Sequence, residues 1–170
     1  MDTSAIIFQR RSIRSFTSQI LKREDIEAIL EAGIWAPSGG NCQPWLFIVV
    51  TDAQDIQDMK ALAPGLIGVP PALVVVCVNL NQASPGDGTS KSSELVALCD
   101  VSMASQNMML SAWSVGIGSC VVKSFSQTGV ANYLDIPEGI RPELLISFGY
   151  ADHVPKPPKR FSLSDVVRWK

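Results

Sequence analysis

The stretch 93–114, SELVALCDVSMASQNMMLSAWS, limits the possible folds more than any other part of the sequence. It predicts one long helix in which Glu94 and Asp100 are the only charged residues and apolar side chains occur on every side. A helix without a charged face has to be buried, either in a core or in an oligomer interface. Its scattered polar residues interrupt any apolar run long enough to cross a membrane. A single small domain could hardly cover so long a helix, and we therefore predict a homodimer.

The other elements follow one another irregularly along the chain. Ile26, Ile29 and Leu30 recur at helical spacing, and Pro37 ends the helix that they indicate. The segment 72–79, ALVVVCVN, is the clearest strand. In all, we expect helices over 3–10, 22–35, 52–62 and 126–134, and strands over 45–51, 72–79, 116–122 and 144–150. This mixed order favours an α+β fold over a regular doubly wound sheet.

Length and composition fit one globular domain that spans residues 1–170. The chain has 170 residues, of which 46% are hydrophobic, and this is enough for a single core. The polar, glycine-rich stretch 81–93 has no periodicity, and we expect it to be a mobile loop. Residues 151–170 are rich in proline and lysine at first and are expected to form a C-terminal arm.

Overall charge excludes a broad nucleic-acid surface, because 14 basic and 16 acidic residues give a net charge of −2. The N-terminal residues lack the apolar run of a secretory signal. The four cysteines, Cys42, Cys77, Cys99 and Cys120, are far apart and form no metal-binding pair. We expect reduced thiols, buried at Cys77 and Cys99, in a cytoplasmic protein without a metal.

His153 is the only histidine, and it lies beside a proline-rich stretch. This argues against catalysis by a serine or cysteine that is paired with a histidine. If the chain is an enzyme, we expect a cofactor to supply its chemistry.

Two short motifs have residues that suit a phosphorylated, ring-containing ligand. Arg10, Arg11, Ser12 and Arg14 offer guanidinium groups and a hydroxyl to phosphate oxygens, although a solvated basic helix end would have the same sequence. The loop 37–45, PSGGNCQPW, combines glycines with amide side chains, so that its backbone can approach a flat polar ring. Taken alone, this loop is better explained as an ordinary helix-to-strand connection.

Two further segments are weaker candidates. The stretch 116–125 lacks the glycine spacing of a dinucleotide-binding motif, and by itself indicates only a tight connection between a helix and a strand. Lys156, Lys159 and Arg160 place positive charge on the C-terminal arm, where a solvated, extended segment is the simpler interpretation.

Together and in this order, these motifs resemble the FMN-dependent nitroreductase family. The resemblance covers nearly the whole chain and rests on RRSIRSF, APSGGNCQPW, DVSMASQNMMLSAWSVGIGSC and PEGIRPELLISFGYADHVPKPPKR. It implies an α+β homodimer with a central, mostly antiparallel sheet flanked by helices. It also implies that the long helix lies at the dimer interface, with two FMN sites between the subunits.

The resemblance assigns expected roles to individual residues. Arg10, Ser12 and Arg14, with Arg11 beside them, match positions that hold the flavin phosphate and ribityl chain, and Arg160 completes the phosphate site. The positions expected to lie against the flavin ring, in part from the other subunit, are Pro37, Ser38, Gly39 and Asn41. The segment expected to pass the ring edge comprises Val121, Val122, Lys123 and Ser124.

The implied activity is an oxidoreductase that takes electrons from NADH or NADPH and passes them by ping-pong turnover to a small acceptor, such as a nitroaromatic or a quinone. No catalytic side chain is required, because the flavin carries the redox chemistry. Two alternatives remain: a flavin-binding or sensing module with little turnover, and a specialised flavoenzyme of the same family.

The sequence departs from the family in three places. Lys123 occupies a position where some relatives have an acidic residue, and the stretch 64–69 lacks the asparagine or lysine that longer relatives use to contact the flavin. The short stretch 81–93 replaces a longer helical insertion. These departures leave the class of acceptor open.

Overall fold

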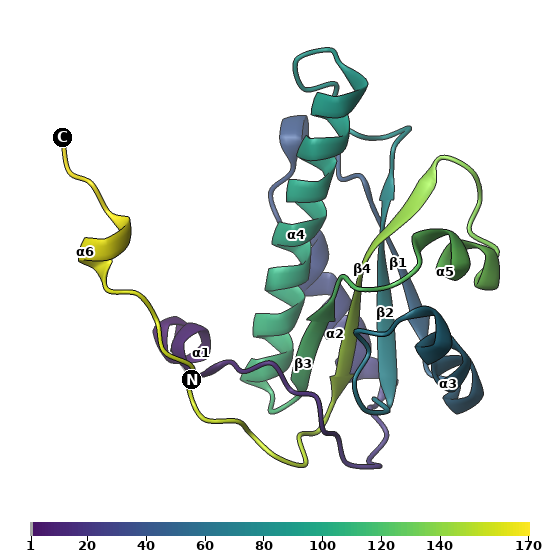
Figure 1. Cartoon of the computed structure of the whole chain (residues 1–170), viewed down its shortest axis with the longest axis vertical. Coiled ribbons are helices and arrows are strands. Elements are labelled where there is room, and N and C mark those ends of the chain that lie inside the picture. The colour runs from purple at the N-terminus through teal and green to yellow at the C-terminus, as the bar shows by residue number, and fades with distance from the viewer. Residues whose placement is uncertain (1) are drawn as a thin grey trace.

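The computed structural model describes residues 2–170 and contains helices on both sides of one sheet (Figure 1). No helix within these residues is both long and apolar enough to span a membrane. In chain order the elements are α1 (Thr3–Gln9), α2 (Arg23–Ile34), the 3-10 turn η1 (Gly39–Asn41), β1 (Trp45–Val50), α3 (Ala53–Leu62), β2 (Ala72–Asn79), α4 (Ser90–Ser114), β3 (Gly118–Val122), α5 (Gln127–Tyr133), β4 (Ile140–Gly149) and α6 (Leu163–Val166).

The four strands form one antiparallel sheet in the order β1-β2-β4-β3. This arrangement confirms the α+β class and the antiparallel sheet expected from the sequence. The register between β2 and β4 shifts once: Val76 pairs with Leu144, whereas Cys77 pairs with Pro142. Glu143 is therefore an extra residue on β4, and such a bulge can redirect a side chain at the edge of a functional site.

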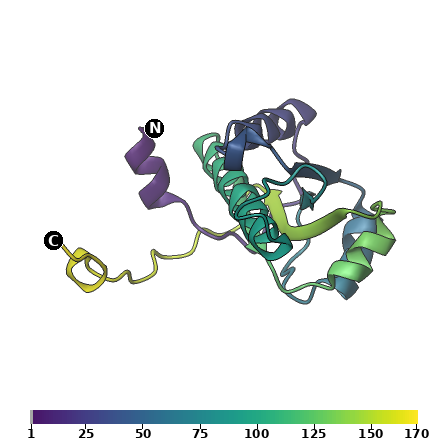
Figure 2. The same cartoon turned by 90° about the horizontal axis from the view of Figure 1, so that it is seen from above.

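Strand β2 is buried on both faces, which explains its almost wholly apolar sequence. Side chains alternate along a strand, so its residues contribute in turn to two separate cores. Val74 and Val76 pack with residues of α2 and α4, while Val75 and Cys77 pack with residues of α3 and α5. Figure 2 shows the two helix layers on opposite sides of the sheet. Burial raises the pKa of the Cys77 thiol to about 12, with a smaller contribution from Glu143.

Helix α4 begins at Ser90, so the loop expected over 81–93 is shorter in the structure. Thr89 is the reason, because its hydroxyl oxygen accepts a hydrogen bond from the backbone N–H of Ser92 and caps the helix. One side of α4 is buried against the sheet and α2. The other side carries an exposed stripe without charge, which comprises Leu95, Cys99, Ser102, Met103 and Gln106. The helix is therefore only half covered by its own chain, and the expectation of a buried Cys99 is wrong.

Two further boundaries differ from the sequence-based expectations. Strand β4 begins at Ile140, four positions before the expected start, because its first residues pair with the end of β2. The arm contains the short helix α6, where Ser162 and Asp165 form a capping box. Neither the first residues of β4 nor α6 has a regular spacing of apolar residues, so the sequence did not indicate them.

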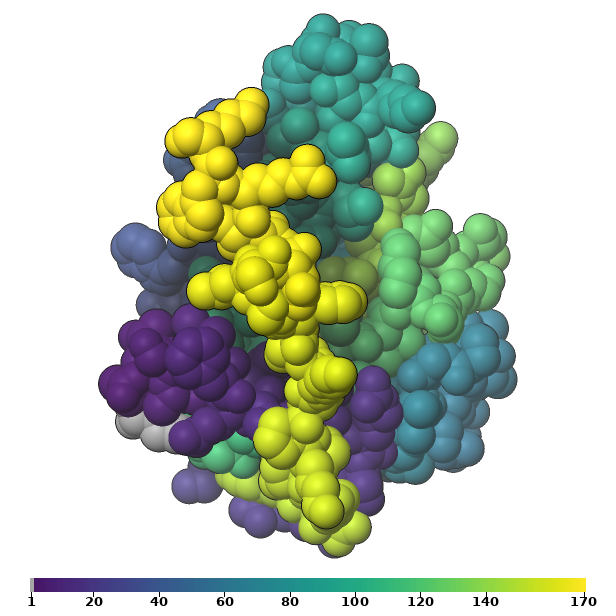
Figure 3. Space-filling model, turned by 60° about the vertical axis from the view of Figure 1, so that its left-hand side comes forward, coloured from purple at the N-terminus to yellow at the C-terminus, as the bar shows by residue number. Residues whose placement is uncertain are grey.

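The N-terminal segment and the C-terminal arm leave the body of the domain side by side (Figure 2). Ser12 bridges to Ser119 of β3, and Phe16 bridges to Ala151 just beyond β4. Beyond these bridges, the arm stands as a separate ridge in front of the body in the space-filling view (Figure 3). Its apolar side chains are exposed, up to 92% for Trp169. The arm thus has no hydrophobic cover within its own chain.

The N-terminal segment is fixed to β3 by one tight contact. Ile13 is fully buried, and its backbone N–H donates to the Ser119 carbonyl at 2.9 Å. A Cβ placed on Gly118 would lie 2.5 Å from Cγ1 of Ile13. Only glycine at 118 therefore allows this approach, which sets the position of the arginines on either side of Ile13.

We expect Gly118→Ala to lower the free energy of unfolding by about 1–3 kcal/mol, because the added methyl group overpacks the contact. Ile13→Ala should cost about 2–5 kcal/mol on its own, through the cavity that it leaves. Because the second change relieves part of the first clash, the double variant should lose less than the sum of the two. Chemical denaturation measures all three variants, and a Gly118→Ala protein as stable as the parent would contradict the contact.

Asp100 fixes the loop around η1 to α4 from inside the protein. Its side chain is 2% exposed, and one carboxylate oxygen accepts a hydrogen bond from the Gly39 N–H at 3.0 Å. The other oxygen has no hydrogen-bond partner among residues 2–170. Burial raises the pKa of Asp100 above its ordinary value, and the bond from Gly39 offsets part of this effect.

The raised pKa predicts how Asp100→Asn changes stability with pH. The protonated carboxyl contributes in full below the ordinary pKa of 3.8, and this contribution is lost as pH rises through the higher folded-state value. The asparagine does not titrate, so the stability of the variant relative to the parent should increase with pH.

Denaturation curves collected from acidic to neutral pH test this expectation. Asp152→Asn is the matched control, because it removes an exposed carboxylate far along the chain from the buried one. If the free energy of unfolding of the variant minus that of the parent stays constant or falls as pH rises, Asp100 is not held at a raised pKa.

Candidate functional site

Five basic side chains converge on one pocket beside the N-terminal segment. The cavity has a volume of about 320 Å³ and is lined by Arg10, Arg11, Ser12, Arg14, Pro155, Lys156, Pro158 and Arg160. No acidic residue belongs to this lining. In a chain with a net charge of −2, such a local concentration of positive charge attracts an anion, which would offset the repulsion between the cations.

The chain brings these residues together through its two ends. Arg10 ends α1, and the bridge from Ser12 to Ser119 holds the following residues along β3. The arm then returns after β4 and adds Lys156 and Arg160 from the other side. The residues that the family resemblance assigned to a phosphate site therefore all line one pocket: Arg10, Arg11, Ser12, Arg14 and Arg160.

The arginines of this cluster are not equivalent. The Arg11 guanidinium donates to the carbonyls of Phe8 and Arg10, at 2.8 and 2.9 Å, and so closes the end of α1. Within residues 2–170, Arg10, Arg14 and Arg160 take part in no ion pair. These three guanidinium groups remain free to bind a phosphate dianion through charge-assisted hydrogen bonds.

The segment expected at the ring edge continues directly from this pocket. Val121 lies two residues beyond Ser119 on β3, which is about 7 Å along a strand. The Val121 side chain is exposed, whereas that of Val122 is buried in the core formed with α3 and α5. Lys123 and Ser124 follow the strand, and the Ser124 carbonyl accepts a hydrogen bond from Gly65. Val122 can therefore meet a ligand only through its backbone.

The loop expected at the ring face lies elsewhere in the chain, against the N-terminal half of α4. A Cβ on Gly39 would lie 2.6 Å from Val96, so this loop packs closely on the helix. Asn41 and Gln43 both adopt positive φ angles, of 56° and 50°, which non-glycine residues seldom do. Such strain is common at ligand sites, where the surrounding structure holds it in place. Pro37 and Asn41 are exposed, and Ser38 is half-buried.

One chain therefore holds two separate parts of the expected site. The basic pocket lies beside the C-terminal half of α4, whereas the loop with Pro37, Ser38, Gly39 and Asn41 contacts its N-terminal half (Figure 1). Strand β3, which leads into the ring-edge segment, runs back alongside the helix. Asp100 and Ser114, at the two levels, are separated by about 21 Å of helix at 1.5 Å per residue. Within one chain, the loop is not part of the basic pocket.

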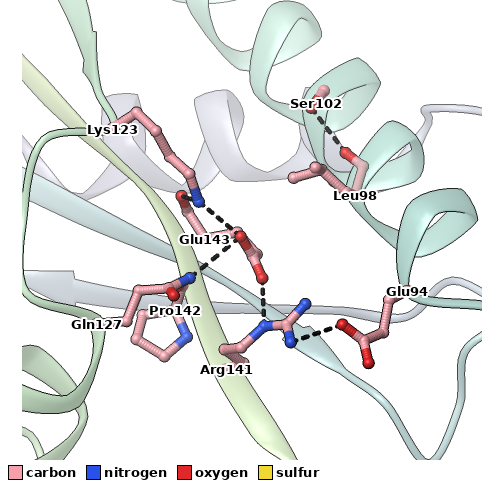
Figure 4. Close-up of polar contacts among 8 residues, drawn as sticks. All are labelled: Glu94, Leu98, Ser102, Lys123, Gln127, Arg141, Pro142 and Glu143. Carbon is pink, nitrogen blue, oxygen red and sulfur yellow. Dashed lines mark hydrogen bonds and ion pairs between the residues drawn. The ribbon is translucent and has the colours of Figure 1, made fainter. Parts of the chain in front are cut away.

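A network of charged side chains surrounds Lys123, and sequence reasoning missed it (Figure 4). Buried Glu143 accepts hydrogen bonds from Lys123, Gln127 and Arg141. Arg141 also pairs with Glu94 of α4 at 2.9 Å, and this hydrogen bond raises the pKa of its guanidinium. The alternating charges Arg141-Pro142-Glu143 were the available signal, but the bulge that redirects Glu143 was not visible in the sequence.

The sequence offered Lys156 only as a weaker candidate, and the family resemblance did not place it among the flavin-binding residues. Lys156 lines the basic pocket together with the arginines. No group of three or more histidine, cysteine, aspartate or glutamate residues in the described chain is placed to hold a metal ion.

Comparison with known proteins gives a consistent result. The sequence pattern of the Nitroreductase family matches residues 7–72 and 65–150. A protein of Archaeoglobus fulgidus, provisionally named NADH dehydrogenase/NAD(P)H nitroreductase, is 36% identical over 94% of this chain and 89% of its own length. An FMN reductase (NADPH) of Bacillus subtilis is 27% identical over 94% of this chain and 71% of its own.

The fold also matches solved structures. A nitroreductase family protein from Streptococcus pneumoniae superposes with a TM-score of 0.91 at 20% sequence identity, over 99% of this chain and 100% of the other. The residues that match the family pattern include α4, β3 and the N-terminal segment from residue 7 onward. On these grounds the chain belongs to the nitroreductase family.

Proposed function

We propose that this protein binds FMN and acts as an oxidoreductase that uses NADH or NADPH as its electron donor. The observation that carries the proposal is the basic pocket, in which five cationic side chains and one hydroxyl face a cavity without any acidic residue. Relatives named NAD(P)H nitroreductase, FMN reductase (NADPH) and NADPH-flavin oxidoreductase support the same activity.

The pocket suits the phosphate end of FMN. Arg10, Arg14 and Arg160 offer paired N–H donors, and the Ser12 hydroxyl adds another. Ser12 is bridged to Ser119, and Val121 lies about 7 Å from Ser119 along β3. This distance suits the ribityl chain between the phosphate and the ring. Val121, Val122, Lys123 and Ser124 would then lie along the edge of the isoalloxazine ring.

A second copy of the chain would supply the remaining face of the site. The uncharged stripe on α4 leaves Leu95 62% exposed, and the arm exposes Phe161 and Trp169. Apolar surface of this extent favours association. In a twofold dimer the same surface meets its own copy, so two antiparallel α4 helices bring the loop end of one beside the arginine end of the other. We therefore propose a homodimer in which Pro37, Ser38, Gly39 and Asn41 reach the flavin of the partner.

The chemistry requires little from individual side chains. When bound, FMN would supply the redox chemistry: it would take a hydride from NADH or NADPH and pass the two electrons, in a ping-pong cycle, to a small acceptor such as a nitroaromatic or a quinone. The residues of this chain bind and orient the cofactor, and the arginine cluster offsets its negative charge. The four unpaired cysteines support a cytoplasmic location.

Removal of two arginines from the pocket tests the proposal. Purified parent protein should stay yellow after incubation with FMN and removal of the unbound flavin, and anaerobic NADH or NADPH should bleach it. Arg10→Ala combined with Arg14→Ala should weaken FMN binding roughly 10²- to 10⁴-fold, because each charge-assisted hydrogen bond contributes about 1.5–3 kcal/mol. Equilibrium titration of the flavin absorbance measures the dissociation constant.

Lys22→Ala combined with Arg23→Ala is the control, because it removes two exposed cations at the start of α2. This control should bind FMN as tightly as the parent. If the pocket variant also retained FMN at parental affinity, the phosphate site would be assigned to the wrong residues. A parent protein that binds no FMN would refute the proposed function.

A further inference from the structure

The bulge residue Glu143 makes an unusual set of contacts at the edge of the sheet. Its side chain is only 4% exposed and is therefore a buried carboxylate. One carboxylate oxygen accepts hydrogen bonds from the Lys123 ammonium at 2.7 Å and the Gln127 amide at 3.2 Å, and the other accepts from Arg141. A buried carboxylate requires such partners, because an unpaired charge in the interior is strongly destabilising.

Lys123 is held unusually firmly for an exposed lysine. Its side chain is 55% exposed, yet its ammonium donates both to the Glu143 carboxylate and to the Glu143 backbone carbonyl, at 2.7 and 2.9 Å. It also lies 5.9 Å from the centre of the Phe125 ring. Figure 4 shows the lysine drawn toward Glu143. A long side chain that would otherwise sample many conformations is thus fixed in one place.

This arrangement lies beside the expected ring edge. Val121 and Lys123 leave the strand on the opposite side from buried Val122, because side chains alternate along a strand. Two cations, Lys123 and Arg141, face two carboxylates, Glu143 and Glu94. The charges balance, so a ligand that approaches this edge meets a neutral group of residues although a lysine is exposed there.

We infer that the Lys123–Glu143 pair determines which charge an electron acceptor can carry. Glu143 is a positioning residue: it holds Lys123 against the sheet and offsets its charge at the ring edge. This inference rests on the proposed function, since it takes the ring to lie along Val121–Ser124. A purely structural pair would stabilise the sheet edge without any effect on ligand charge.

Opposite changes to the pair should have opposite effects. Glu143→Gln leaves the lysine uncompensated and adds a positive charge, whereas Lys123→Gln leaves the carboxylate in excess and adds a negative one. Benzoate and benzamide are suitable probes, because they are similar in shape, differ in charge and are not reduced. Their dissociation constants from the FMN-loaded protein follow from the change in flavin absorbance.

We expect the ratio of the benzoate to the benzamide constant to fall roughly fivefold in Glu143→Gln and to rise by a similar factor in Lys123→Gln. This magnitude is that of one charge about 8 Å away at an effective dielectric constant of about 40. The double variant should return close to the parental ratio. The reduction potential of bound FMN should also shift in opposite directions, upward in Glu143→Gln and downward in Lys123→Gln.

Lys60→Gln is the matched control, because it removes a lysine from α3 on the other face of the sheet and should leave the ratio unchanged. If Glu143→Gln fails to fold, the ratio measured for Lys123→Gln alone tests the inference, because the Lys123 side chain is exposed and its replacement should not prevent folding. Ratios that stay constant, or move in the same direction in both variants, overturn the inference while FMN binding by the parent upholds the proposed function. A parent that binds no FMN overturns both.

Discussion

Helix α4 has two faces that need cover, and its own chain supplies cover for only one. The buried face packs against the sheet and α2, where Val101, Met108 and Ala112 are fully inaccessible. The opposite face has no charge, and its apolar side chains Leu95 and Met103 are exposed to solvent. Because apolar surface is costly to expose, this one helix links the core of the monomer to the homodimer that we propose. It also separates the two parts of the candidate site, since the loop contacts its N-terminal half and the basic pocket lies beside its C-terminal half.

The second constraint is electrostatic. Five cations that lie close to one another repel, and a bound anion would offset this repulsion. Segments near both ends of the chain contribute to the cluster. The close contact of Gly118 with Ile13 holds one side of the cluster in place. By contrast, the charges around Glu143 are balanced within the protein. The molecule thus has one site built to attract an anion and, a few residues along β3, a second region where charge is kept neutral.

Sequence reasoning succeeded where the local pattern alone determines the structure. The apolar run 72–79 matches β2 at both ends, because a strand covered on both faces admits little else. The helix expected over 22–35 is observed as α2 within one residue at each end. The antiparallel sheet is also as expected, although that expectation came from the family resemblance. The start of α4 was missed because the capping hydroxyl belongs to Thr89, inside a stretch without any apolar period.

Contacts between residues far apart in the sequence could not be predicted from the spacing of residue types. Arg160 lies far along the chain from Arg14, and only the family resemblance brought the two together before the structure did. The network around Glu143 depends on a one-residue register shift, which leaves no mark in composition or periodicity. Likewise, the contact of Asp100 with Gly39 joins residues 61 positions apart, and neither sequence segment indicates it.

Subunit complementation tests most directly whether the site is shared between two copies. One variant carries Arg10→Ala and Arg14→Ala, and the other carries Gly39→Val, which displaces the loop from α4. Neither variant alone should retain FMN that NADH or NADPH can bleach. When the two are co-expressed, half of the dimers are mixed and each has one intact site, so about a quarter of the parental bleaching should return. No recovery in mixed dimers that form normally would contradict a site built from both subunits.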